Sequence, residues 1–208
     1  AMASAQNGIL LHGGLRTYVG CFLVFSDYMK NAIRMAALSH LPAIYLFSHD
    51  SIAVGEDGPT HQPIEQLASL RAMPNLFVFR PADIKELIGT WNIIINNKIP
   101  SVISLPKTEI KAEQGTSISE VSKGAYIAGK EKVMPQLVIL ATGSEVQVAK
   151  SLQVKLYSEG IDSRVVSMPC MELYNVQPQP YKEELFPRLR GMFAFAIWDK
   201  EKKELFFS

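Results

Sequence analysis

Apolar runs and amphipathic stretches alternate along most of the chain. The short apolar runs, which suit buried parallel strands, are residues 42–47, 76–79 and 101–105. The stretches with apolar residues at helical spacing are residues 25–38, 62–72 and 82–95. This alternation predicts an α/β fold in which a mostly parallel sheet is covered by helices on both faces.

A polar segment, residues 108–120, interrupts this alternation and is interpreted as a linker. A second series of elements follows it, with a strand over residues 136–141, a helix to about Tyr157, a stop at Gly160 and a strand over residues 163–168. We therefore predict a first domain over residues 1–107 and a second, smaller α/β domain over residues 121–187. The second domain is short, so we expect it to be incomplete.

Composition narrows the class of protein. The 208 residues are 48% hydrophobic and 20% charged, as in a soluble globular chain, and the formal net charge is only +1. That charge provides no strong field for nucleic acid or for an anionic membrane surface. We find neither a membrane-length apolar run nor the basic start of a secretion signal, so a cytoplasmic location is expected. Cys21 and Cys170 are predicted to be reduced packing thiols.

The polar stretch HDSIAVGEDGPTHQP, residues 49–63, directly follows a predicted strand. In open α/β sheets the carboxyl ends of the strands are where ligands bind. One interpretation is a well-capped loop, with Thr60 as the cap of the next helix. The other is a ligand site built on His49, His61 and Asp57, because histidine suits hydroxyls, phosphates and proton transfer. There is no HxxxH spacing, so we predict no metal site in this chain.

Residues 49–83, which read HDSIAVGEDGPTHQPIEQLASLRAMPNLFVFRPAD, closely resemble the pyrimidine-binding domain of transketolases. These thiamine diphosphate enzymes move two-carbon ketol units between sugar phosphates. The resemblance extends through GCFLVFSDY at residues 20–28 and LATGSE at residues 140–145, and covers residues 1–187. It implies a thiamine diphosphate-binding fold. Dihydroxyacetone synthase is the relative most easily confused with this pattern.

The resemblance implies a role for three aromatic residues. Phe22, Phe25 and Tyr28 match the family's pocket for the aminopyrimidine ring of the cofactor. Their i, i+3, i+6 spacing, taken alone, favours an ordinary core stripe instead. His61 matches a histidine that contacts the substrate near the reacting carbon, so it is the expected catalytic residue.

The resemblance also implies substrate ligands. Asp57 matches the acid that binds the C2 hydroxyl of the donor sugar, and His49 matches a phosphate ligand. Lys107 falls where the family usually has an arginine that binds the substrate phosphate. Lysine keeps the charge but lacks the two-pronged guanidinium, which weakens the inference of tight phosphate binding. An ordinary exposed lysine after a strand is an equally good interpretation.

Other parts of the family's site are expected outside this sequence. The family's glutamate that acts on the aminopyrimidine lies in a motif reading REHAM, of which the chain begins at Ala1-Met2. Diphosphate and magnesium (Mg²⁺) are expected only in a separate diphosphate-binding domain or subunit. We therefore expect a homo- or hetero-oligomer that acts on sugar phosphates, with no activity from this chain alone. The alternative is a non-catalytic α/β domain or partner-binding fragment that retains the fold.

The last residues, 188–208, carry a different pattern. An apolar strand over residues 192–198, a charged turn over 199–204 and a second strand over 205–207 predict a hairpin. The sequence RLRGMFAFAIWDKEKKELF resembles a hairpin of the glutamine amidotransferase domain of asparagine synthetase. We therefore expect a join near Pro187. That domain's nucleophilic cysteine has no counterpart here, so amidotransferase activity is not implied.

Overall fold

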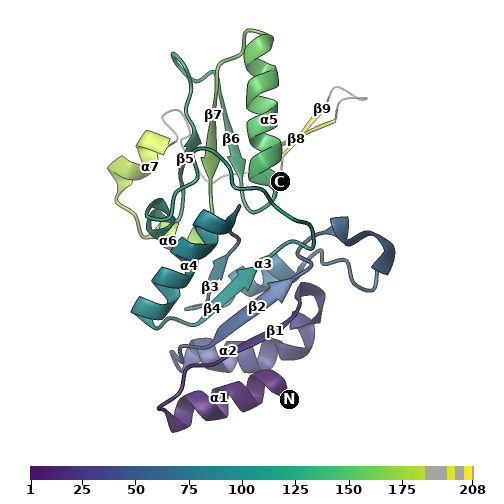
Figure 1. Cartoon of the computed structure of the whole chain (residues 1–208), viewed down its shortest axis with the longest axis vertical. Helices are drawn as coiled ribbons and strands as arrows, with labels where there is room; N and C mark the ends of the chain where they lie inside the picture. The colour runs from purple at the N-terminus through teal and green to yellow at the C-terminus, as the bar shows by residue number, and fades with distance from the viewer. Residues whose placement is uncertain (186–195, 200–203, 208) are drawn as a thin grey trace. The chain divides into compact units, whose positions relative to one another are not determined.

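Four strands form the first sheet, in the order β1-β2-β4-β3, and all of them run parallel (Figure 1). They are β1 Tyr18–Phe22, β2 Ile44–Ser48, β3 Phe77–Phe79 and β4 Ser101–Ser104. The structure is a computed structural model that describes residues 1–185, 196–199 and 204–207. Residues 1–177 form one unit and residues 178–208 another.

Helices cover both faces of this sheet. The helical elements are α1 Met2–His12, η1 Leu23–Met29, α2 Lys30–Leu38, η2 Ile52–Asp57, α3 Gln66–Arg71 and α4 Ile84–Asn97. Side chains alternate along β2, so Tyr45 and Phe47 belong to a core with α1, α2 and α3, whereas Ile44 belongs to a second core with α4. This arrangement confirms the predicted α/β class with a parallel sheet between helices.

Two predicted helices differ from the structure in their first turns. The stretch predicted as one helix over residues 25–38 is a 3₁₀ helix, η1, followed by α2. The helix predicted from Gln62 begins at Gln66, and Thr60 does not cap it. Instead the side chain of Gln66 accepts the N–H of Ile64 at 2.9 Å, which satisfies that backbone group outside a helix.

A second, mixed sheet follows in the same unit, with the order β5-β7-β6 (Figure 1). Its elements are η3 Glu120–Lys123, β5 Tyr126–Gly129, β6 Leu137–Ala141, α5 Glu145–Ser158, β7 Ser163–Ser167 and α6 Met171–Asn175. β6 and β7 are parallel, and β5 pairs antiparallel with β7. This sheet, with its helices, corresponds to the second, smaller α/β part of the fold that the sequence predicted.

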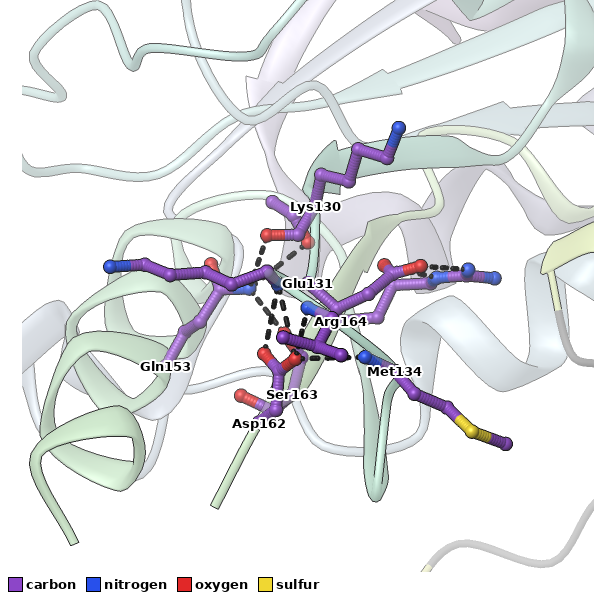
Figure 2. Close-up of polar contacts among 10 residues, drawn as sticks. Lys130, Glu131, Met134, Gln153, Asp162, Ser163 and Arg164 are labelled. Atoms are coloured by element: carbon purple, nitrogen blue, oxygen red, sulfur yellow. Dashed lines mark hydrogen bonds and ion pairs between the residues drawn. The ribbon is translucent and has the colours of Figure 1, made fainter. Parts of the chain in front are cut away.

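The loop between β5 and β6 is tied to β7 by polar contacts (Figure 2). Asp162 accepts the three consecutive backbone N–H groups of residues 132–134, and these hydrogen bonds lower its pKa. Arg164 is paired with Glu131, with Nε 2.8 Å from Oε2. Gln153 of α5 donates to the carbonyl of Ser163 at 2.6 Å. The second sheet therefore has its own polar framework.

The segment predicted as a linker is anchored to α4. Asp83 is 5% exposed, and its Oδ1 accepts the N–H groups of Lys85 and Glu86 as the N-cap of α4. Its Oδ2 accepts the N–H of Glu113 at 2.8 Å and the hydroxyl of Thr116 at 2.6 Å. A single carboxylate thus fixes both the start of a helix and the connection to the second sheet.

The second unit contains α7 Gln179–Leu185 and the antiparallel pair β8 Ala196–Asp199 and β9 Glu204–Phe207. Residues 196–199 pair with residues 204–207, as in the predicted hairpin, but Asp199 and Glu204, which were predicted as turn residues, are strand residues. The predicted strand residues 192–195 and turn residues 200–203 lie outside the described residues. Among the described residues, no helix is long and apolar enough to cross a membrane.

Candidate functional site

The carboxyl ends of the parallel strands bring residues from far apart in the sequence to one edge of the first sheet. Phe22 is the last residue of β1, His49 directly follows β2, and Arg80 directly follows β3. Lys107 lies three residues beyond the end of β4. Because parallel strands all point the same way, these positions share the edge at which α/β sheets bind ligands.

Five of the predicted site residues form one cluster of rings. The rings of Phe22 and His49 are stacked, with centroids 3.7 Å apart. Phe25 lies 6.0 Å from Phe22 and 6.2 Å from Tyr28. His61 approaches Phe25 edge-on, with centroids 5.2 Å apart. The structure therefore brings together Phe22, Phe25, Tyr28, His49 and His61, which the sequence separates by up to 39 residues.

The 3₁₀ geometry of η1 explains why Phe25 and Tyr28 share one face, and Phe22 lies directly before η1. With three residues per turn, positions i, i+3 and i+6 lie above one another. Leu23 and Ser26 form the buried face of η1. Phe22 and Phe25 are only half-buried, and Tyr28 is 86% exposed. The aromatic face consequently lies outside the core, in contrast to the core-stripe interpretation.

Each clustered histidine has a hydroxyl partner at Nδ1. Ser48 Oγ lies 2.9 Å from Nδ1 of His49, and Thr60 Oγ1 lies 2.8 Å from Nδ1 of His61. These contacts orient the imidazoles and leave Nε2 of each ring for an outside partner. Thr60, which the sequence suggested as a helix cap, instead positions a candidate catalytic side chain.

The remaining two predicted residues, Asp57 and Lys107, are paired with each other. Nζ of Lys107 lies 3.2 Å from Oδ2 of Asp57 and also donates to the carbonyl of Val54 at 3.0 Å. The two charged side chains are 37% and 42% exposed. Lys107 is therefore a contact of the loop that carries Asp57, not an isolated surface lysine.

An ion-pair network that sequence analysis missed lies beneath this edge. Nε of Arg80 is 2.7 Å from Oδ2 of Asp50, and the Arg80 and Asp50 side chains are 7% and 0% exposed. Nη1 of Arg80 is paired with Glu145 of α5 and donates to the carbonyl of Thr142 at 3.0 Å. Burial opposes the charge of Arg80, but the two carboxylates outweigh it and raise the Arg80 pKa.

The sequence contains a pattern that could have identified Asp50 and Arg80 as a candidate pair. Asp50 and Arg80 each follow an apolar run that the pattern marks as a parallel strand. Charged residues at the carboxyl ends of two strands in one parallel sheet are candidates for pairing at the shared edge.

A cavity of about 220 Å³ lies between the loop after β2, the residues after β4 and the first turn of α5. Its polar lining comes from both sheets and consists of Asp50, Ser51, Lys107, Thr108, Ser144 and Glu145. Within the described residues, no group of three or more His, Cys, Asp or Glu side chains could hold a metal ion. Cys21 and Cys170 are both free, and Cys170 is buried. Among the described residues, the groups at this edge of the sheet that could bind a ligand are aromatic rings, hydroxyls and individual charged side chains.

Comparison with protein families gives two matches. Residues 1–113 match the family described as transketolase, pyrimidine binding domain, and residues 124–199 match the transketolase-like TK C-terminal domain. The second match runs past Pro187, where we expected a join. The comparisons give the asparagine synthetase resemblance of the tail no support.

Curated relatives agree with these matches. The probable transketolase of Streptococcus pneumoniae is 50% identical over 188 residues, which cover 90% of this chain and 29% of the relative. The transketolase of Bacillus subtilis is 49% identical over 192 residues, with the same coverage of each chain. The chain therefore spans about 29% of the length of these relatives.

Solved structures show the same fold. The transketolase of Leishmania mexicana superposes with a TM-score of 0.86 at 44% identity, covering 89% of this chain and 28% of that one. A split gene transketolase, described as an inactive beta4 tetramer, superposes with a TM-score of 0.59 at 24% identity over 80% of this chain and 53% of that one, which shows a shared fold alone. Given the pyrimidine-binding family match over more than half of its residues, the chain belongs to the transketolase family.

Proposed function

We propose that this chain contributes the pyrimidine-binding and substrate-binding side of a site that transfers two-carbon ketol units between sugar phosphates in the cytoplasm. The observation that carries the proposal is the ring cluster of Phe22, Phe25, Tyr28, His49 and His61 at the ligand-binding edge of the sheet. The family relationship supports it, because the relatives that the chain resembles are transketolases.

The aromatic face fits the aminopyrimidine ring of thiamine diphosphate. Phe22 and Phe25 are half-buried beside the exposed ring of Tyr28, so a flat heteroaromatic group can stack there. Aromatic pairs of this kind contribute about 0.5–1.5 kcal/mol beyond the burial of apolar area. When bound, thiamine diphosphate supplies the nucleophilic carbon for attack on the ketose carbonyl. Its diphosphate and Mg²⁺ are assigned to a diphosphate-binding domain or subunit, the partner we propose in a homo- or hetero-oligomer.

The histidines and charged residues are proposed to hold the sugar phosphate. Nε2 of His61 would contact the substrate near the reacting carbon and move a proton there, since its Nδ1 is held by Thr60. Asp57 would accept the C2 hydroxyl of the donor, while His49 and Lys107 would bind the phosphate. Holding the sugar in this way supplies orientation, which is a large part of such a catalyst's work.

The proposal is tested by coexpressing the chain with the diphosphate-binding part of a transketolase relative. Ketol transfer from xylulose 5-phosphate to ribose 5-phosphate is then measured with thiamine diphosphate and Mg²⁺. We expect transfer, and we expect His61→Ala to lower kcat by roughly 10²–10⁴-fold, the usual contribution of a positioned acid–base group. His12→Ala is the matched control, because His12 is exposed at the end of α1.

Two outcomes would contradict the proposal. An assembled complex that transfers nothing would favour a non-catalytic domain that only retains the fold. Equal loss of activity in His61→Ala and His12→Ala would mean that His61 has no special place in the reaction.

A further inference from the structure

His49 is held in an unusual backbone conformation. Its φ is +60°, in the left-handed region that residues with a Cβ rarely adopt, although histidine tolerates it better than most. In this conformation its ring stacks on Phe22 with centroids 3.7 Å apart. A strained conformation of this kind persists only when its surroundings fix it. Contacts of the chain near residues 49 and 50 must therefore hold His49 in this conformation.

The next residue, Asp50, provides the strongest fixed point. Its side chain is 0% exposed, and Arg80 Nε meets its Oδ2 at 2.7 Å. A buried carboxylate must keep such a partner, because an unpaired charge in the interior is strongly unfavourable. Moving the backbone at Asp50 would break this contact, so the ion pair restrains the rotation that places His49.

The other end of Arg80 reaches the second sheet. Its guanidinium is paired with Glu145, the first residue of α5, and donates to the carbonyl of Thr142, which directly follows β6. The backbone of Arg80 adds a third link, since its carbonyl accepts the N–H of Gly143 at 3.0 Å. Gly143 has a φ of +60°, and a Cβ there would lie 2.8 Å from Cγ of Arg80. The turn at Gly143 therefore fits closely around this side chain.

We propose that Arg80 is a positioning residue. It links residues 142–145 to Asp50 and thereby fixes where the ring of the neighbouring His49 lies. The planar guanidinium suits this role because its donors lie on separate nitrogens at fixed angles, so Nε meets Asp50 while Nη1 meets Glu145 and Thr142. The single nitrogen of an ammonium group lacks that span. That the position of His49 matters for phosphate binding rests on the proposed function. The positioning of His49 by Arg80 rests on the contacts alone.

The ring stacking gives a readout that a general loss of stability would not move. Protons over the face of an aromatic ring are shielded, so Hε1 of His49 should resonate upfield of the other histidines. The chain has four histidines, and with ¹³C-labelled histidine each gives one Cε1–H signal. Phe22→Leu removes the ring, which both assigns the His49 signal and defines its unstacked position.

The test records this signal in the full chain carrying Arg80→Lys or Glu145→Gln. We expect the His49 signal to move toward its unstacked position in both variants, and farther in Arg80→Lys. Glu145 is half-exposed, so Glu145→Gln leaves no buried charge unpaired and keeps the test valid even if Arg80→Lys does not fold. The matched control is Arg164→Lys, which alters an arginine of β7 that is 10% exposed, against 7% for Arg80, and is likewise paired with a glutamate. It should leave His49 in place.

An unmoved His49 signal in either folded variant would overturn the proposal, and so would an equal movement in Arg164→Lys. This result is independent of catalysis. Failure of ketol transfer with a His49 signal that responds as expected would contradict the proposed function and leave the positioning role intact.

Discussion

Lys107 and Asp57 form an ion pair, with 3.2 Å between Nζ and Oδ2, across the candidate substrate site. The resemblance to transketolases assigns the lysine to the substrate phosphate and the aspartate to a sugar hydroxyl. In the free chain each of these two side chains therefore has the other as its partner, in the place that the substrate would take. Both side chains are more than a third exposed, so solvent screens the pair and its contribution is only about 0.2–1 kcal/mol. Such a contact can yield to a ligand.

Asp57→Asn should consequently tighten binding of inorganic phosphate, because Lys107 no longer has a competing carboxylate. The gain should be about 1.5- to 5-fold, which is the free energy of a screened pair expressed as an affinity. Titration of the full chain with phosphate, followed by the His49 Cε1–H signal, measures this affinity.

Two further variants separate the pair from the general charge of the loop. Glu56→Gln removes a neighbouring exposed charge and should have a smaller effect. Lys107→Met should abolish the binding. Identical affinities in Asp57→Asn and the unmodified chain would mean that the pair does not compete with phosphate.

Phe25→Ala should weaken thiamine diphosphate binding in the assembly with a diphosphate-binding partner while changing the melting temperature little. The reason is that Phe25 is half-buried among Phe22, Tyr28 and His61, outside the core. The contrasting variant is Phe47→Ala, whose side chain is 0% exposed and whose loss should cost about 3–5 kcal/mol of unfolding free energy. Isothermal titration calorimetry measures the cofactor affinity of each variant, and thermal unfolding measures its stability. A large drop in stability with unchanged cofactor affinity in Phe25→Ala would make Phe25 a core residue.

The sequence predicted those elements whose periodicity is unambiguous. The apolar run at residues 42–47 became β2, and the helical pattern at residues 82–95 became α4 with Asp83 as its cap. The 3₁₀ helix η1 was predicted as α-helix, because apolar residues three apart suit either geometry. Local patterns therefore identify an element more reliably than its exact helical type.

Contacts between residues far apart in the sequence could not be predicted from local patterns. The resemblance supplied the ring cluster, whereas Asp50 and Arg80, thirty residues apart, were not recognised as a pair. Their contact depends on β2 and β3 lying in one parallel sheet with β4 between them. Strand order is set by the packing of the whole sheet, so no local pattern contains it.

Asp83→Ser should release the connection between the two sheets without unfolding α4. Serine is a good N-cap and replaces the role of Oδ1, but it cannot also reach Glu113 and Thr116 as Oδ2 does. Trypsin should then cut faster after Lys111, which is exposed in this segment. Thr116→Val removes one of the two linker contacts and should give an intermediate rate. Equal cleavage in all three chains would show that Asp83 does not hold the segment.

Glu86 is a fully buried carboxylate at the contact between α4 and the second sheet. Its Oε1 accepts the hydroxyls of Tyr126 at 2.6 Å and Ser167 at 2.5 Å, and its Oε2 accepts the N–H of Ala82 at 2.7 Å. Burial raises the Glu86 pKa above its ordinary value of 4.5, and these hydrogen bonds offset the increase only in part. The folded chain therefore holds this proton more tightly than the unfolded chain does.

The sign of the resulting pH dependence follows from that difference. Between pH 4.5 and the higher pKa of the folded state, the folded chain binds more protons, so the contribution of Glu86 to stability falls as pH rises. Glu86→Gln is neutral at every pH and can still accept the N–H of Ala82, so it should remove this decline. Urea unfolding at about pH 5 and about pH 8 should show the unmodified chain losing stability relative to Glu86→Gln. A stability difference between the two chains that stays constant, or that shifts in favour of the unmodified chain at the higher pH, would mean that Glu86 is already ionised in the folded state at the lower pH.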